Sequence, residues 1–214
     1  MGLGERMSEN VLNLPVETTP ALTDVMYVLT DPSGSPIDSQ ATLQTVSNLV
    51  RSDLVAFVAT ASATLANSTA EATILGAGSG SLTLAAGYLN TIGKSLHVRV
   101  MGIISNTGTP TFTVKMKFGS TVQASTGAVT TPASLSNSIF VADFWLTCIT
   151  TGVTGTVRTQ GTMQLGAAVA GAPSTAAVTN DLTGALVIDV TGQWSAMSVS
   201  NTITVSNVYV EKVN

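Results

Sequence analysis

The sequence predicts an all-β fold, an antiparallel β-sandwich that follows an extended N-terminal arm with one short helix. Two observations support this class. Apolar and polar residues alternate in several runs, and Gly, Thr, Asn and Pro punctuate the chain between them. In addition, only 9% of the 214 residues are charged, against roughly 25% in an average soluble protein. A chain so poor in charge suits a subunit that covers part of its surface with neighbours.

The alternation is clearest in two consecutive runs. Leu96, Val98 and Val100 alternate with polar or longer side chains, and residues 112–118 alternate in the same way. Side chains two apart on a strand share a face, so each run has one buried face and one exposed face. The segment Asn-Thr-Gly-Thr-Pro at 106–110 has turn chemistry. We therefore expect the two runs to form an antiparallel strand pair.

Shorter runs continue the pattern through the rest of the chain. Further strands are expected at 71–75, 81–84, 121–125, 138–150, 156–165, 186–190 and 201–211. In the longest run, every second residue from Phe140 to Cys148 is apolar, which predicts a buried face. Gly161 is a candidate β-bulge. Residues 127–138 and 166–183 are rich in small residues and Pro, and are expected to be loops.

The first seventy residues differ from the remainder. We predict an attachment arm at 1–70 and a sandwich domain at 71–214. The arm has one strand-like run at 25–29 and a short amphipathic helix near 39–50, where apolar residues fall at helical spacing. It holds no apolar set large enough for an interior of its own. We expect it to be ordered by a partner surface or by other copies of the chain.

Charge and cysteine content exclude several classes of protein. The net charge is −4 and basic residues do not cluster, so we expect no nucleic-acid partner. No apolar run approaches the ~20 residues of a membrane-spanning helix, and no cleaved signal peptide is evident. We therefore expect synthesis in the cytoplasm and no membrane partner. Cys148 is the single cysteine, so an internal disulfide is excluded, and a buried small apolar residue is the expected role.

Residues capable of catalysis are few. His97 is the only histidine, and one histidine with one distant cysteine is poor material for a zinc site that takes about four ligands. Four acidic residues are candidates for paired carboxylates: Asp143, Asp181, Asp189 and Glu211. Their spacing selects no pair for acid–base work on sugars. The chain also lacks a Gly-x-Ser-x-Gly elbow. We expect a protein that is not an enzyme and that binds no cofactor or metal.

Aromatic residues leave two interpretations open. The candidates are Tyr88, Trp145, Trp194 and Tyr209. They could stack against a glycan, or they could pack in the core or between subunits. The second interpretation is the simpler one, because large aromatic side chains are mostly buried.

Three sets of residues together resemble a virion protein of tailed bacteriophages. They are Leu-Pro-Val-Glu-Thr-Thr-Pro at 14–20 with 23–29, 31–34 and 41–43; the runs 93–102 and 109–119; and Val-Arg-Thr-Gln-Gly at 157–161 with 200–205. The first set is similar to N-terminal attachment regions of phage structural proteins. The other two resemble a jelly-roll-like module of phage fibres and capsid surface proteins. No long heptad region or repeat array is present, which makes an elongated fibre shaft a poor fit.

This resemblance implies a homotrimer on the surface of the phage particle, most simply a capsid decoration (cement) protein bound to the major capsid protein or another virion protein. A short tail fibre or receptor-binding protein whose sandwich loops contact a host glycan is the alternative, and a glycan-cleaving enzyme is the least favoured. The residues expected to attach the chain to the virion are Leu14, Pro15, Val25, Tyr27, Leu29, Leu43, Val46 and Leu49.

Overall fold

The computed structural model describes residues 25–29, 38–42, 55–173 and 176–214, and none of these residues lies in a helix. Every strand pairing is antiparallel, and the predicted all-β class is confirmed. The chain divides between Arg51 and Ser52 into two units. Each unit is considered separately below.

The first unit contains a two-stranded ribbon of β1 (Val25–Leu29) and β2 (Asp38–Thr42). Val25 lies opposite Thr42, and Leu29 lies opposite Asp38. The helix predicted near 39–50 is therefore wrong for residues 39–42, because their backbone groups pair with β1. Residues 43–50 lie outside the described part of the chain. The run predicted as a strand at 25–29 is β1.

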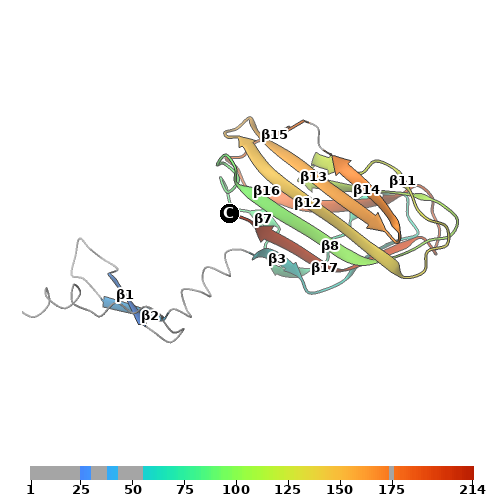
Figure 1. The fold of residues 1–214 in the computed structure, drawn as a ribbon, viewed down its shortest axis with the longest axis horizontal. Coiled ribbons are helices and arrows are strands. Elements are labelled where there is room, and N and C mark those ends of the chain that lie inside the picture. The colour runs from blue at the N-terminus through green and yellow to red at the C-terminus, as the bar shows by residue number, and fades with distance from the viewer. Residues whose placement is uncertain (1–24, 30–37, 43–54, 174–175) are drawn as a thin grey trace, which may run out of the picture. The chain divides into compact units, whose positions relative to one another are not determined.

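The larger sheet of the second unit has nine strands, in the order β14-β13-β12-β8-β17-β3-β6, with β15 also paired to β13 and β4 to β17. Its strands are β3 (Val55–Ala59), β4 (Ala63–Ala66), β6 (Gly78–Gly80), β8 (Ser95–Ser105), β12 (Ser138–Thr150), β13 (Gly155–Leu165), β14 (Ala168–Pro173), β15 (Val178–Asn180) and β17 (Thr202–Lys212). Figure 1 shows β13, β12, β8 and β17 side by side.

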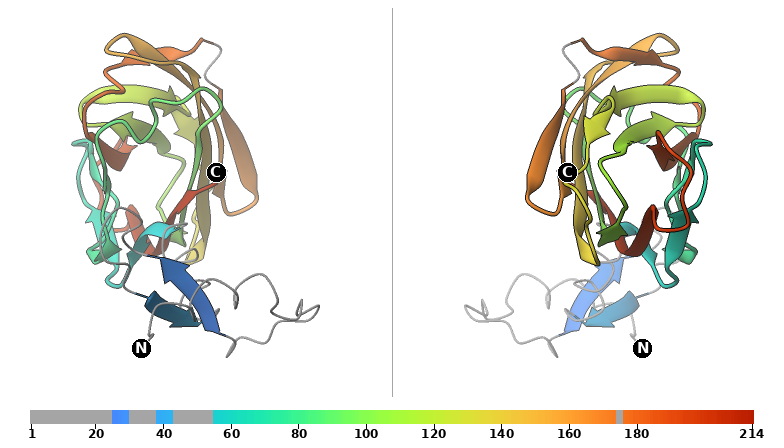
Figure 2. Two further views of the ribbon diagram at one scale, coloured as in Figure 1. Left: turned by 90° about the vertical axis from the view of Figure 1, so that its left-hand side faces the viewer. Right: turned by 90° about the vertical axis from the view of Figure 1, so that its right-hand side faces the viewer.

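The smaller sheet has six strands, in the order β10-β9-β16-β5, with β11 paired to β9 and β7 to β16. Its strands are β5 (Ala72–Thr73), β7 (Thr83–Leu84), β9 (Thr111–Phe118), β10 (Thr121–Ser125), β11 (Val129–Thr130) and β16 (Leu186–Trp194). The two sheets face each other, as the edge-on views of Figure 2 show. This arrangement is the β-sandwich that the alternating runs predict.

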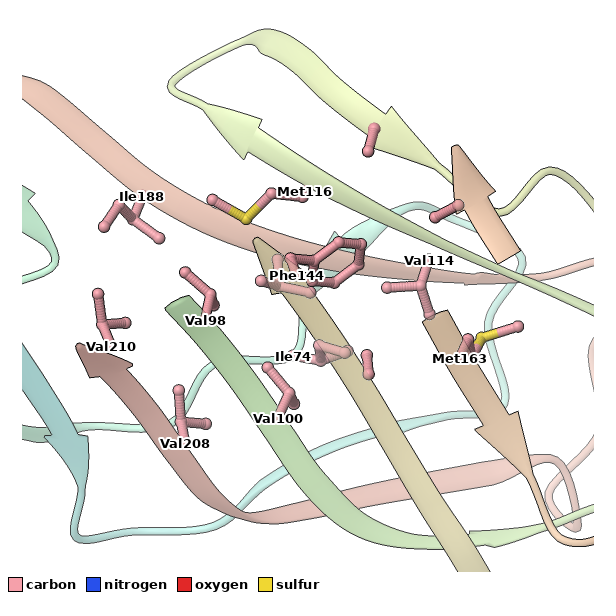
Figure 3. Close-up of a cluster of buried hydrophobic side chains, with 14 of the residues drawn as sticks. Ile74, Val98, Val100, Val114, Met116, Phe144, Met163, Ile188, Val208 and Val210 are labelled. Carbon is pink, nitrogen blue, oxygen red and sulfur yellow. The ribbon is translucent and has the colours of Figure 1, made fainter. Parts of the chain in front are cut away.

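Apolar side chains from both sheets fill the space between them. Figure 3 shows Val98 of β8 and Val210 of β17 pointing toward Met116 of β9 and Ile188 of β16. The alternating apolar residues predicted at 96–100, 112–118 and 140–148 are all buried: Leu96, Val98, Val100, Phe112, Val114, Met116, Phe118, Phe140, Ala142, Phe144, Leu146 and Cys148. The inward faces predicted from period-two alternation are therefore confirmed.

The strand pair expected from residues 94–119 does not form. Strand β8 pairs with β12 and β17 in the larger sheet, whereas β9 pairs with β10 and β16 in the smaller one. The short connection after β8 crosses from one sheet to the other. Buried Asn106 holds this crossing, since its Nδ2 donates to Thr131 Oγ1 at 2.7 Å and its Oδ1 accepts from Leu135 N at 2.7 Å. Turn residues at this point therefore make a crossover, not a hairpin.

Gly161 is not a bulge. It lies opposite Phe144 on β12 and Ala172 on β14 with no shift of register. A Cβ at this position would lie 2.4 Å from Phe144 Cδ1 and 2.6 Å from the Asp143 carbonyl oxygen. Glycine is needed here because the Phe144 ring lies directly beneath the strand.

Two further boundaries differ from the prediction. The segment 166–183, expected to be a loop, contains strands β14 and β15. The predicted domain boundary at residue 70 lies later than the division in the structure, which falls at Ser52. Strands β3 and β4 explain the difference, because both pair with β17 and so belong to the larger sheet.

Candidate functional site

The outer face of the larger sheet carries two rows of polar and aromatic residues that cross neighbouring strands. Strand register aligns Glu211, His97, Trp145 and Gln160 in the first row, and Tyr209, Arg99, Asp143, Thr162 and Gly171 in the second. These residues sit at alternate positions to the buried ones, so the pleat directs them outward. We call these nine residues the outer-face cluster.

His97 lies between two carboxylates. Its Nε2 is 3.1 Å from Asp143 Oδ1, and its Nδ1 is 3.1 Å from Glu211 Oε2. The doubly protonated ring can donate to both carboxylates, whereas a neutral ring can donate to only one. Arg99 Nε lies 3.6 Å from Asp143 Oδ2, so this carboxylate also faces a guanidinium group. The histidine ring is held from both sides.

Trp145 stacks on this fixed histidine. The two ring centroids are 4.3 Å apart and the planes meet at 15°. His97 reaches the indole from β8, on one side of β12, while β13 lies on the other side. The residue is nevertheless 50% exposed. The stack thus fixes the orientation of an indole that remains open to solvent.

A depression of about 510 Å³ adjoins the indole on the β13 side and is lined by Asp143, Trp145, Gln160, Gly161, Thr162 and Gly171. A second depression, of about 310 Å³, shares Asp143 and Thr162 with it. A third, of about 190 Å³, shares Trp145 and Gln160. The three adjoin one another along the β12–β13 pair, and we call them together the β12–β13 groove.

A second charged cluster lies on the smaller sheet. Glu71 accepts hydrogen bonds from Lys115 Nζ at 2.6 Å, Thr191 Oγ1 at 2.8 Å and Lys117 Nζ at 3.1 Å. The bonds from Lys115 and Thr191, and then that from Lys117, hold the pKa of Glu71 at about 2 although partial burial opposes them. These contacts connect the start of β5 to β9 and β16. Both carboxylate oxygens of Glu71 accept hydrogen bonds, so this cluster has a structural role.

Three of the eight residues predicted to attach the chain to a virion lie in the described part of the chain. Val25, Tyr27 and Leu29 occupy alternate positions of β1. Leu14, Pro15, Leu43, Val46 and Leu49 lie outside the described residues. Their grouping remains a prediction.

The structure separates the four aromatic candidates. Trp194 is buried and packs on Phe112, with ring centroids 4.7 Å apart. Tyr88 lies beneath the ammonium groups of Lys94 and Lys212. Trp145 and Tyr209 belong to the outer-face cluster, where only Trp145 lines the groove. Core packing is therefore confirmed for Trp194, and an open aromatic surface is present at Trp145.

Of the acidic candidates, Asp143 contacts His97 Nε2 and Glu211 contacts His97 Nδ1. Asp181 instead accepts hydrogen bonds from the backbone and hydroxyl of Thr183, as expected for a turn residue. No local signal in the sequence marks Arg99, Gln160 and Thr162 as site residues. Their outward orientation could have been inferred from the alternation along each strand. Their alignment with Trp145 depends on the register between strands, which the sequence does not give.

Cys148 is buried at 1% exposure, as expected for a small apolar core residue, and burial raises the pKa of its thiol. Among the described residues, no group of three or more His, Cys, Asp or Glu side chains is arranged to hold a metal ion. The same residues contain no helix of the length and apolarity needed to cross a membrane.

Comparison with known proteins yields no matching family model, no matching curated protein and no matching solved structure. Functional inference therefore depends on the geometry of the fold and of the outer-face cluster.

Proposed function

We propose that this chain is a structural subunit of a tailed-phage virion, a homotrimeric decoration (cement) protein with a jelly-roll-like sandwich. Residues 1 to about 50 would bind the head through the major capsid protein or another virion protein. The observation that carries the proposal is the division of the chain at Arg51 and Ser52. The sandwich that follows this division has a core contributed by both of its sheets. Such a plan suits a folded module joined to an attachment segment.

Surface composition supports association between copies. Met197 and Val199, in the connection between β16 and β17, are 68% and 77% exposed. Val153, in the connection between β12 and β13, is 66% exposed. With only 9% charged residues in the chain, such apolar positions favour contact with other copies over a freely dissolved single chain.

Deletion of residues 1–50 tests the attachment role. We expect the remaining chain to fold, to form trimers in size-exclusion chromatography with light scattering, and to lose binding to purified phage particles that lack the full-length protein. The full-length chain is the positive control. Retention of particle binding by the shortened chain would overturn the attachment role, and a monomeric full-length chain would overturn the trimer.

The alternative is a short tail fibre or receptor-binding protein that contacts a host glycan. One observation favours it: the half-exposed Trp145 beside the β12–β13 groove. Labelled antibody against the sandwich distinguishes the two locations on intact particles. Label over the head supports decoration, and label at the tail supports the alternative.

A further inference from the structure

We propose that the β12–β13 groove is a binding site for an uncharged oligosaccharide, with Trp145 as its stacking platform. This site lies on the sheet face and not in the sandwich loops. It goes beyond the decoration function and does not depend on where the protein sits on a particle.

The indole of Trp145 has the properties that sugar stacking requires. A pyranose presents a face of C–H groups that packs on an aromatic ring and removes apolar area from water. His97 covers one face of the indole at 4.3 Å and holds its plane, while the groove lies toward the opposite strand. Because the ring is held before any ligand arrives, little side-chain entropy is lost on binding.

Polar groups around the indole match the hydroxyl groups of a sugar. Asp143 supplies carboxylate acceptors, Gln160 supplies both amide donors and an acceptor, and Thr162 supplies a hydroxyl. Gly171 faces Thr162 and adds no side chain at the groove's edge, so a ligand can approach the backbone there. Apolar floor with a few oriented polar groups is the usual composition of a small-molecule site.

The shape of the groove favours a chain of sugars over a single ring. Its three depressions extend from Ile139 to Ile149 along β12, and ten residue-to-residue steps along a strand span roughly 34 Å. The central depression of about 510 Å³ lies within the range of roughly 300–1,000 Å³ for ligand pockets. Successive sugar units can therefore occupy adjoining depressions, with one of them on Trp145.

Charge at the centre of the groove argues against anionic ligands. Asp143 is the charged residue that lines the central depression beside Trp145, whereas Arg99 lines the second depression and Arg158 the third. A phosphate or carboxylate group in the central depression would meet the Asp143 carboxylate. An extended peptide is also disfavoured, because peptides add to the unpaired edge of a sheet and both β12 and β13 are paired on each side.

The test is titration of the full-length protein with uncharged hexasaccharides of α-1,4-glucose, β-1,4-glucose and β-1,4-N-acetylglucosamine. Binding is monitored by tryptophan fluorescence and by calorimetry. Trp145 dominates the fluorescence change because Trp194 is buried. We expect at least one hexasaccharide to bind, and the single sugar of the same type and sialyllactose to bind at least tenfold more weakly.

Three variants locate the site. Trp145→Ala should weaken binding at least tenfold, Trp145→Phe should keep part of it, and Thr162→Val should weaken it several-fold. Ile92→Ala is the matched control, since it removes an apolar side chain that is 70% exposed and does not line the groove. The melting temperature and the mass of the assembled oligomer are measured for each variant to show that the fold and the assembly persist.

The inference is overturned if no hexasaccharide binds at about 10 mM, roughly tenfold above a Kd of 1 mM. It is also overturned if Trp145→Ala and Trp145→Phe both bind as tightly as the unaltered protein. If Trp145→Ala changes the mass of the assembled oligomer while sugar affinity stays the same, this face is assigned to contact between copies instead. None of these outcomes bears on the particle-binding test, which measures the effect of deleting residues 1–50.

Discussion

The outer faces of the two sheets contain charged clusters of opposite character. On the smaller sheet, Glu71 is surrounded by Lys115, Lys117 and Thr191, and its hydrogen bonds join three strands. On the larger sheet, Asp143 and Glu211 both bind His97, and the result is a fixed but half-exposed Trp145. The first cluster is closed on itself. The second holds an apolar surface in a defined position, which is what a binding site requires.

The largest effect that separates the two faces is expected at Gly161, directly beneath the groove. Gly161→Val should lower the free energy of unfolding by about 3 kcal/mol, because the added carbons overlap Phe144 and the Asp143 backbone. Urea denaturation measures it. Gly184→Ala is the control, since a Cβ there meets nothing closer than 3.9 Å, and it should change stability by less than about 0.5 kcal/mol. Equal stability of the two variants would contradict the close packing beneath β13.

Loss of a carboxylate should destabilise the Glu71 cluster on the smaller sheet more than the outer-face cluster on the larger sheet. Glu71→Gln should lower stability by about 1–2 kcal/mol, because two ammonium groups lose a partly buried partner. Glu211→Gln on the other face should cost less than about 0.5 kcal/mol, since its side chain is 48% exposed. Urea midpoints of both variants give the comparison. A larger loss of stability in Glu211→Gln than in Glu71→Gln would show that the outer-face cluster has the structural role.

Lowering the pH should destabilise the protein through the Glu71 carboxylate. The pKa of Glu71 is about 2 in the folded protein and 4.5 ordinarily, so the unfolded chain takes up this proton first as the pH falls. The stabilisation is complete above about pH 4.5 and is lost between about pH 4.5 and about pH 2. Urea midpoints across this window should fall less steeply for Glu71→Gln than for the unaltered protein. Parallel curves would contradict the assignment.

The smallest effect is expected at His97, which acts through Trp145. His97→Ala should leave stability within about 1 kcal/mol but free the indole, so acrylamide should quench Trp145 more strongly and hexasaccharide affinity should fall a few-fold. His97→Phe keeps a ring against the indole and should restore both properties. Failure of His97→Phe to restore them would show that the hydrogen bonds to Asp143 and Glu211, and not the stack, position Trp145.

Alternation predicted which side chains form the core, but not which strands are neighbours. The residues from Leu96 to Val100 and from Phe112 to Phe118 are buried at every second position, as their pattern requires. The same pattern is satisfied whether the two runs pair in one sheet or face each other across the interior. Asn106 decides between these arrangements through bonds to residues 25 and 29 positions later. Such distant contacts leave no local signal in the sequence.

The candidate site was less predictable than the core for the same reason. Trp145, Asp143, His97 and Glu211 were each recognisable as residues of interest, yet they come from three strands separated by up to 114 positions. Only the register of β12 and β17 on β8 places them together. In the first unit, the apolar spacing near 39–50 indicated a helix, but pairing with β1 determines the backbone of residues 39–42.

The position of β17 has a consequence for synthesis of the protein. This strand occupies the interior of the larger sheet, between β8 and β3, although it is the last strand along the chain. While the ribosome adds the 97 residues that follow Ser105 up to and including Thr202, β8 has one edge without its final neighbour. At ~5–20 residues per second this interval lasts roughly 5–20 s. A nascent chain with an open apolar edge for that time is a natural substrate for chaperones, and ribosome pausing before residue 202 would increase its tendency to aggregate.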